Sequence, residues 1–467
     1  MDEIALASPI LHIERNTTMS AIKVYDKPLN TIPALLAAID AGELDATLNA
    51  LGSAGGAIAQ RARIKALVES FTSLYGADRE VALLTVSGRS ELSGNHTDHN
   101  YGCVIAASIS LDVLAVASPR DDGMIHLKSE GFDEDVVDLS VFKTPDPAKF
   151  GNSSALIAGV CVGLENAGYT VGGFDACTVS NVFKGSGLSS SAAFEDMVGT
   201  IESHLYNNGK VDEVTIAKIA QFSENQFFGK PCGLMDQVAC AVGGIVAIDF
   251  ADPSAPVIEA LPFDMTAAGY HLCIVNTGGN HADLTDDYAA VPAEMKAVAA
   301  HLGQPVLRKT DKQAVINAIP ALRETVGDRA ILRALHFFNE NDRVAAQKAA
   351  LQTAIAATDL AARDAAVDEY FAGVLASGKS SYCYLQNVYT TKNVAEQGLS
   401  LALCLCEQVL GGKRAAYRVH GGGFAGTIQA YVPEELVETF TATMDAAFGK
   451  GATYDLKIRP VGAARIF

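Results

Sequence analysis

The sequence contains no tryptophan and is poor in basic residues: 35 Lys and Arg stand against 54 Asp and Glu, which gives a formal net charge of −19. No cluster of Lys and Arg supplies the basic face that a duplex nucleic-acid binder needs, so nucleic acid is excluded as a partner. We interpret the acidic balance as a solvated surface. Such a surface still permits phosphate binding where backbone N–H groups and a metal ion meet the phosphates.

Long uncharged apolar runs are also missing. None reaches the roughly 18 residues that a membrane span needs. The segment after Asp2 and Glu3 lacks the basic and apolar regions of a signal peptide. The nine cysteines are odd in number and spread over a long chain, which favours reduced thiols over a disulfide framework. We therefore expect a cytoplasmic protein without a membrane partner.

Apolar residues make up 49% of the chain and charged residues 19%, which suits a large core and excludes disorder. The length predicts two domains. Helical periodicity covers residues 30–75 and most of 284–412, with loops expected at 339–341 and 377–378, whereas a long β-prone stretch occupies 104–118. No internal repeat is visible. The predicted class is α+β, with a mixed N-terminal half and a more helical C-terminal half.

A glycine- and serine-rich segment lies between a β-prone stretch, 176–183, and a helix expected from about Ser190. Glycines let backbone N–H groups approach an anion, the helix N-terminus adds partial positive charge, and serine hydroxyls add donors or a metal ligand. The segment predicts a phosphate-binding loop, although a plain glycine turn with serine N-caps would look the same. Its candidate binding residues are Gly185, Ser186, Gly187, Leu188, Ser189, Ser190 and Ser191.

A second segment, Gly373–Ser380, matches the Walker A pattern G-x-x-x-x-G-K-[ST]. That motif needs a strand before its loop. Here Val367, Tyr370 and Phe371 form a helical stripe, and Gly378 is expected to end a helix as its C-cap. We interpret the match as coincidence.

Three further segments concentrate polar or small residues. Gly88–Asn100 is dense in polar side chains and is expected to lie between two strands, either as an exposed loop or as a binding site. Pro231–Gln237 places one carboxylate, Asp236, among small and apolar residues, which suits either a base or a helix N-cap. Gly421–Gly426 is either a tight hairpin or a backbone surface for a ligand.

Together these segments resemble the motifs of the galactokinase family within the GHMP kinase superfamily. Gly88–Asn100 is similar to the family's G-R-x-N-L-I-G-E-H-T-D-Y-N, Pro231–Gln237 to P-C-G-I-M-D-Q, and Gly421–Gly426 to G-G-G-F-G-G. Gly185–Ala192 resembles the phosphate motif of the superfamily, and Arg333–Val344 resembles a C-terminal galactokinase segment. The motifs follow the family order along the chain.

The resemblance covers about residues 65–467 and implies a two-domain GHMP kinase fold with the active site in the cleft between the domains. It implies a helical N-terminal extension at 1–62, an N-terminal domain with the phosphate loop at 63–265, and a C-terminal domain at 266–467. The implied activity is ATP-dependent phosphorylation of the C1 hydroxyl of galactose or a close relative. The implied partners are a small sugar and ATP, and we expect a monomer or a weak homo-oligomer.

Matched position by position, the resemblance implies that Asp236 takes or orients the proton of the sugar C1 hydroxyl. Arg89 would stabilise the developing charge and keep Asp236 ionised. Ser191 and Glu224 would hold Mg²⁺, and loop 185–191 would wrap the phosphates of ATP. These roles suit phosphoryl transfer, in which positioning and charge neutralisation dominate. The implied sugar-binding residues are Asn95, His96, Asp98, Gly233 and Tyr288.

Several positions depart from the family pattern, among them His99, which stands where the family carries Tyr. Asn95 stands where the family carries the Glu that grips the sugar's C6 hydroxyl, and Glu91 stands where it carries Asn. One interpretation is a substrate altered at C6, such as galacturonate, because the lost carboxylate would no longer repel an acid. The other is a plain galactokinase in which Glu91 substitutes locally. A non-catalytic regulator that binds sugar and ATP is a third alternative, although Asp236, Arg89 and the loop serines are all present.

Two other segments leave questions open. Ser153 and Leu156 stand near positions where some relatives carry aromatic residues beside the nucleotide base, so the nucleotide preference is not defined. Leu385–Tyr389 replaces an acidic stretch of the family and receives no role.

Overall fold

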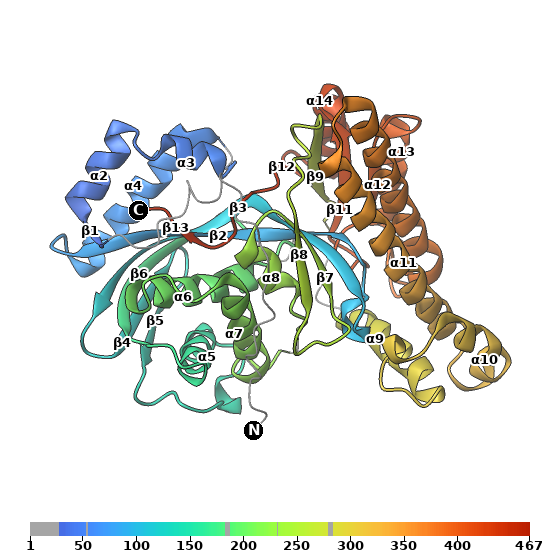
Figure 1. The fold of residues 1–467 in the computed structure, drawn as a ribbon, viewed down its shortest axis with the longest axis horizontal. Helices are drawn as coiled ribbons and strands as arrows, with labels where there is room; N and C mark the ends of the chain where they lie inside the picture. Colours follow the sequence, from blue (N-terminus) through green and yellow to red (C-terminus); the bar gives the residue numbers. More distant parts are fainter. Residues whose placement is uncertain (1–27, 53–54, 183–186, 231, 279–283) are drawn as a thin grey trace.

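Two β-sheets and the helices packed on them form the molecule (Figure 1). The structure is a computed structural model that describes residues 28–52, 55–182, 187–230, 232–278 and 284–467. Within these ranges, nine strands join the first sheet and four join the second. The fold class expected from the sequence, α+β with a more helical C-terminal part, is confirmed.

The first sheet is built around two long antiparallel strands, β2 (Glu80–Ser93) and β3 (Cys103–Arg120). Both are buried along nearly their whole length. Apolar runs such as 104–107 and 113–117 suit this burial, and buried polar residues such as Asp112 and Arg89 interrupt them. β2 runs on through Gly88 to Ser93, so the first part of the segment expected to be a loop is strand. The other strands of this sheet are β1 (Asn30–Thr31), β4 (Met124–Ser129), β5 (Glu134–Asp138), β6 (Gly173–Ser180), β7 (Ile245–Asp249), β8 (Val257–Leu261) and β13 (Ala464–Arg465).

Helices cover the first sheet on both faces, and the side chains of β2 alternate between them (Figure 1). Ala82, Leu84 and Val86 lie in the core that includes α5, α6, α7 and α8, whereas Val81 and Leu83 pack with α2, α3 and α4. The helices expected in the described part of the N-terminal region are therefore present. The bounds are α2 (Ile32–Ala41), α3 (Asp45–Ala50), α4 (Gly56–Tyr75), α5 (Ser153–Asn166), α6 (Ser190–Tyr206), α7 (Glu213–Gln226) and α8 (Met235–Val242).

The second sheet is antiparallel, with strand order β10-β11-β9-β12, and it is also covered on two faces. Leu272, Ile274 and Tyr431 pack with α11 and α12, and Val275 and Ile428 pack on the opposite face with α13 and α14. The strands are β9 (Tyr270–Asn276), β10 (Ala416–Val419), β11 (Thr427–Pro433) and β12 (Thr453–Leu456). The helices are α9 (Thr285–His301), α10 (Lys312–Thr325), α11 (Asp328–Ala356), α12 (Leu360–Ser380), α13 (Gly398–Leu410) and α14 (Val437–Phe448).

The last strand, β13, returns to the first sheet and pairs with β2, with Ala464 opposite Thr85. The chain therefore crosses between the two sheets a second time near its C-terminal end. The domain boundaries given above remain predictions.

Two predicted loops are wrong. Residues 339–341 lie inside α11, and α12 continues past Gly378 to Ser380, after which a π-helical turn spans Ser381–Leu385. The polar residues at 339–341 predict a break, but the Asn341 side chain accepts a hydrogen bond from the Cys103 N–H at 2.7 Å, so a tertiary partner satisfies Asn341 within the helix.

Gly378 is a packing position rather than a helix C-cap. A Cβ at this glycine would lie 3.0 Å from the Cβ of Arg418, so α12 approaches β10 closely there. The whole Walker A look-alike is helical, which confirms that it is no phosphate loop.

A buried cluster of charges joins the helical N-terminal region to the first sheet and to the C-terminal end of the chain. Asp112 on β3 forms a salt bridge with Arg63 on α4. Its other oxygen accepts hydrogen bonds from Arg459 and from Thr85, each at 3.0 Å. Asp112 and Arg459 are both almost fully buried. Within the described ranges, no helix is long and apolar enough to cross a membrane.

Replacing Asp112 with asparagine should destabilise the protein by about 3–5 kcal/mol, because it leaves the buried guanidinium of Arg459 without a counter-charge. Urea denaturation followed by circular dichroism measures the effect. The control is Asp40→Asn, which removes the exposed ion pair with Lys65 and should cost no more than about 1 kcal/mol. Equal effects of the two substitutions would contradict the role given to Asp112.

Candidate active site

A salt bridge joins Arg89, on β2, to Asp236, in the first turn of α8. Both Nε and Nη2 of Arg89 lie 2.7 Å from Oδ1 of Asp236, and the hydroxyl of Ser189 donates to Oδ2. The Arg89 side chain is 8% exposed, whereas that of Asp236 is 34% exposed. The carboxylate therefore has an open side from which a small molecule can approach it.

Asp236 is ionised at neutral pH. Burial raises its pKa, but the charge of Arg89 and the hydrogen bonds from Arg89 and Ser189 outweigh burial and lower the pKa below the ordinary 3.8. An ionised carboxylate with an open side can accept a proton or orient a hydroxyl group.

The described part of the phosphate-loop candidate, Gly187–Ser191, lies against Arg89. Gly187 and Ser189 have φ angles of 72° and 57°, in the left-handed region, and α6 begins at Ser190. The carbonyl of Gly187 accepts a hydrogen bond from the Arg89 guanidinium, and that of Leu188 accepts one from the Arg89 N–H at 3.1 Å. Gly185 and Ser186 lie outside the described residues.

The tight fit of this loop on β2 needs a glycine at position 88. A Cβ there would lie 3.0 Å from the Leu188 carbonyl oxygen and 3.0 Å from the side chain of Val182. The strand, the turn and the N-terminus of α6 therefore form one compact unit with N–H groups at the start of a helix, where anions bind.

The two residues predicted to hold a metal ion lie on neighbouring helices, Ser191 on α6 and Glu224 on α7. Glu224 is buried, and its oxygens accept hydrogen bonds from Lys230 at 2.8 Å and from Gln237 at 3.0 Å. Among the described residues, no group of three or more His, Cys, Asp or Glu side chains is arranged to hold a metal ion. A cation at Ser191 and Glu224 would therefore need oxygen atoms from a bound ligand to complete its coordination.

Glu195 belongs to the same cluster, and the sequence analysis missed it. It lies four residues after Ser191 on α6, a spacing that puts both on one helix face. Gln237 donates to Glu195 at 3.2 Å and to Glu224 at 3.0 Å, so one amide bridges the two acids. Burial and the nearby charge of Glu224 raise the pKa of Glu195 well above its ordinary value. The helical spacing was the signal that could have identified it.

The residues predicted to bind the sugar fall into two groups. Asp98 and Gly233 lie together, since a Cβ on Gly233 would be 2.5 Å from Oδ2 of Asp98. His96 and Tyr288 meet the glycine turn that follows β10: Nε2 of His96 is 2.9 Å from the Gly422 carbonyl oxygen, and the Tyr288 hydroxyl donates to the carbonyl of the next glycine at 2.8 Å. Burial lowers the pKa of His96 to about 4, so its imidazole is neutral at pH 7.

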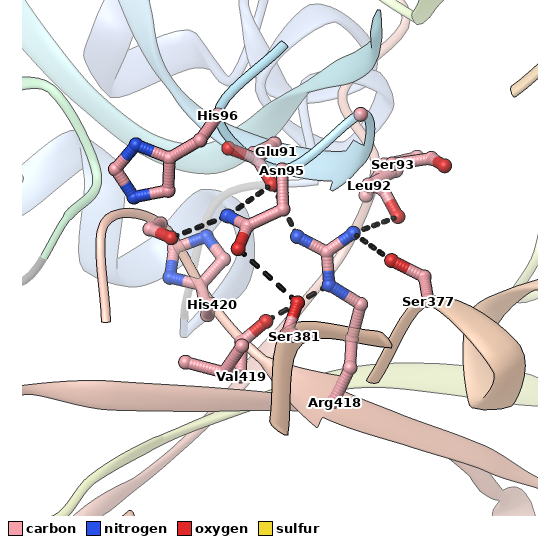
Figure 2. A network of polar contacts seen from close by, with 12 residues as sticks. Glu91, Leu92, Ser93, Asn95, His96, Ser377, Ser381, Arg418, Val419 and His420 are labelled. Carbon is pink, nitrogen blue, oxygen red and sulfur yellow. Dashed lines mark hydrogen bonds and ion pairs between the residues drawn. The ribbon is translucent and has the colours of Figure 1, made fainter. Parts of the chain in front are cut away.

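Asn95 is fully buried and lies at the centre of a polar network with Arg418 (Figure 2). Its side-chain amide donates to Glu91 at 3.1 Å and to the Gly421 carbonyl at 2.6 Å. Its side-chain oxygen accepts from two residues that follow α12: Ser381 at 3.2 Å and Asn387 at 2.8 Å. Asn387 belongs to Leu385–Tyr389, so this segment has a structural role at Asn95.

Helix α11 holds the backbone of this turn. Glu340 accepts hydrogen bonds from the N–H groups of Gly94 at 3.3 Å and Asn95 at 3.4 Å, and His336, one helical turn earlier, contacts the Asn95 carbonyl oxygen at 2.9 Å. Burial raises the pKa of Glu340, but His336 and two nearby arginines outweigh it and lower the pKa to about 2. Both His336 and Glu340 lie in Arg333–Val344, the segment that resembles the galactokinase family, but the sequence did not indicate that they contact Gly94 and Asn95.

Arg418 on β10 was also missed. It is fully buried and forms a salt bridge with Glu91. It also donates to the hydroxyl of Ser377 at 3.2 Å and to the Leu92 carbonyl at 3.4 Å (Figure 2). It therefore connects the end of β2 to the second sheet and to α12.

Comparison with known proteins defines the class first. The family model described as GHMP kinases N terminal domain matches residues 155–244, which contain the loop at α6 and the Asp236 region. The crystal structure of a mevalonate kinase from Methanococcus jannaschii is similar in fold, with a TM-score of 0.54, 13% identity, and coverage of 82% of this chain and 98% of that one. The protein has the fold of a GHMP kinase.

More specific matches follow. The galactokinase galactose-binding signature matches residues 69–119. A galactokinase of Streptomyces coelicolor is 31% identical over 383 residues, which covers 81% of this chain and 92% of that protein. The crystal structure of a Lactococcus lactis galactokinase complexed with galactose has a TM-score of 0.70 and 25% identity, and it covers 86% of this chain and all of that one. The chain belongs to the galactokinase family.

Replacing Ser189 with alanine should move the acid limb of the activity profile to higher pH. The pKa of Asp236 is lowered on folding, so its carboxylate is active above that pKa and is lost only as the pH falls below the ordinary 3.8. The alanine variant lacks one hydrogen bond that lowers this pKa. The measurement is kcat/KM against pH; Ser190→Ala, which keeps that bond, is the control and should retain the wild-type acid limb. A limb that stays in place or moves down in Ser189→Ala would contradict the assignment.

Replacing Glu340 with glutamine should raise the KM for the sugar about tenfold, because a small displacement of a positioning group weakens binding strongly. The KM for ATP should stay within about twofold, since Glu340 contacts Gly94 and Asn95, beside the predicted sugar-binding residues. Steady-state kinetics test this. The neighbouring exposed residue on α11 supplies the control, Asp342→Asn, which should change neither constant. A parallel rise in both KM values would show general damage instead.

Proposed function

We propose that this protein transfers the γ-phosphoryl group of ATP to the C1 hydroxyl of galactose. The observation that carries the proposal is the ionised, partly exposed carboxylate of Asp236, paired with Arg89 beside the loop Gly187–Ser191. A base next to a phosphate loop suits transfer from a nucleotide to a hydroxyl group. Membership of the galactokinase family and the match to its galactose-binding signature support galactose as the acceptor.

In the proposed reaction the C1 oxygen of the sugar attacks the γ-phosphorus, and the bond from that phosphorus to the β–γ bridging oxygen breaks. Asp236 accepts the hydroxyl proton or holds the hydroxyl in line. Arg89 keeps Asp236 ionised and adds positive charge near the transferred group. Phosphoryl transfer depends mainly on such positioning and charge neutralisation, so these two residues supply what the step requires.

The nucleotide phosphates would lie against Gly187–Ser191 and the N-terminus of α6, whose N–H groups favour anions. We assign Ser191 and Glu224 to Mg²⁺, because hydroxyl and carboxylate oxygens suit this cation. When bound, Mg²⁺ neutralises charge on the β- and γ-phosphates. The side chain of Lys230, which pairs with Glu224, is 60% exposed and can withdraw toward solvent.

For the sugar we retain His96, Asp98, Gly233 and Tyr288 as proposed contacts. Asn95 was the fifth candidate, but all its side-chain hydrogen bonds are made within the protein. No observation favours galacturonate or a non-catalytic regulator over galactose phosphorylation. We further propose a cytoplasmic enzyme, monomeric or weakly oligomeric, in keeping with its acidic composition.

The purified protein should convert galactose and ATP to galactose 1-phosphate and ADP at about 1–100 turnovers per second. Coupled detection of ADP and phosphorus NMR of the product measure this. EDTA should abolish turnover, and excess Mg²⁺ should restore it. Asp236→Ala is the catalytic control and should lose at least about 100-fold in kcat. Turnover of galacturonate but not of galactose, or saturable sugar binding without turnover, would contradict the proposal.

A further inference from the structure

The exchange of Glu and Asn between positions 91 and 95 is explained by the hydrogen bonds of Asn95. A side-chain amide has two N–H donors and two acceptor sites. The donors of Asn95 bond to Glu91 and the Gly421 carbonyl, and its oxygen accepts from Ser381 and Asn387. The side chain is fully buried. Asn95 thus has no hydrogen-bonding capacity left for a sugar hydroxyl.

The carboxylate of Glu91 can accept further hydrogen bonds. Arg418 and Asn95 both donate to Oε1 of Glu91, and Oε2 accepts no hydrogen bond from any residue in the described ranges. Oε2 is also absent from the set of fully enclosed side-chain atoms of those ranges that lack a partner, so this oxygen keeps some accessible surface. A carboxylate oxygen in such a place needs water or a ligand donor, because an unmet acceptor away from water costs free energy.

The position of Glu91 suits a ligand at the active site. Arg89 and Glu91 lie two residues apart on β2 in unbroken register with β3, opposite Ser108 and Ala106, so their side chains leave the same face of the strand. Arg89 reaches Asp236 on that face. Figure 2 shows Glu91 next to Asn95. The amide nitrogen of Asn95 donates to Oε1 of Glu91 at 3.1 Å.

We propose that Glu91 supplies the carboxylate that accepts a hydrogen bond from a sugar hydroxyl other than the one phosphorylated. Asn95 is then a positioning residue, which holds Glu91 and the Gly421 carbonyl in place. This rests on the proposed phosphorylation of galactose. A carboxylate acceptor binds a hydroxyl roughly twice as strongly as a neutral one. It also repels a sugar acid, so the exchange favours a neutral hexose over galacturonate.

The first experiment compares wild type and Glu91→Gln on galactose and on its 2-, 3-, 4- and 6-deoxy forms. If Glu91 binds one hydroxyl, the wild type has a lower kcat/KM for the deoxy sugar that lacks this hydroxyl than for galactose. In Glu91→Gln this preference for galactose should shrink about tenfold or more, and the preferences over the other deoxy sugars should not change. The KM for ATP should stay within about twofold. Ser381→Ala is the matched control: it removes a partner of Asn95 without touching Glu91, so it should affect all the sugars equally.

The second experiment moves the carboxylate and covers the case in which Glu91→Gln does not fold. Asn95→Glu alone sets a second carboxylate against Oε1 of Glu91 and should lower kcat/KM for galactose at least about tenfold. The double variant Glu91→Asn with Asn95→Glu restores one acid and one amide. It should recover most of that loss, and its thermal unfolding midpoint should rise above that of Asn95→Glu.

The outcomes separate the two proposals. If wild type does not phosphorylate galactose, the proposed function fails, whatever the variants do. If wild type is active but Glu91→Gln keeps its discrimination against every deoxy sugar, the assignment of Glu91 is wrong. An equal loss on all the sugars, or a double variant no better than Asn95→Glu, would also overturn it.

Discussion

The buried ion pair between Glu91 and Arg418 joins the end of β2 to β10, and much of the site depends on it. Two charges removed from water are stable only when further hydrogen bonds surround them. Asn95, Ser377 and the Leu92 carbonyl supply those bonds. The pair thus holds β2 of the first sheet against β10 of the second. Arg89 lies just before the pair on β2, and the glycine turn Gly421–Gly423 follows it after the end of β10.

The proposed catalytic pair and the turn at Asn95 contact different elements of the fold. Arg89 and Asp236 meet the loop at the start of α6, within the first sheet and its helices. The turn at Asn95 meets β10, α11 and the segment after α12. A buried arginine holds each group: Arg89 pairs with Asp236, and Arg418 pairs with Glu91.

The acids of the site differ because their surroundings differ. Arg89 and Ser189 keep Asp236 ionised, and nearby cations do the same for buried Glu340. Glu195, buried beside the charge of Glu224, has its pKa raised instead. Three carboxyl groups thus differ in state: Asp236 is kept ionised and is the proposed base, Glu340 is kept ionised and accepts hydrogen bonds from backbone N–H groups, and burial opposes the ionisation of Glu195.

The fold class, the helix that begins at Ser190 and the pairing of Arg89 with Asp236 could be predicted from the sequence, because each has a local pattern or a family motif. The residues that surround the turn at Asn95 could not be predicted, because they meet only when the chain folds. Glu340 and Arg418 come from segments more than 200 residues away, and the bonds of Asn95 have no local signature. For the same reason the polar residues at 339–341 predict a loop where the structure has a helix: Glu340 and Asn341 bond to distant partners, which periodicity cannot reveal.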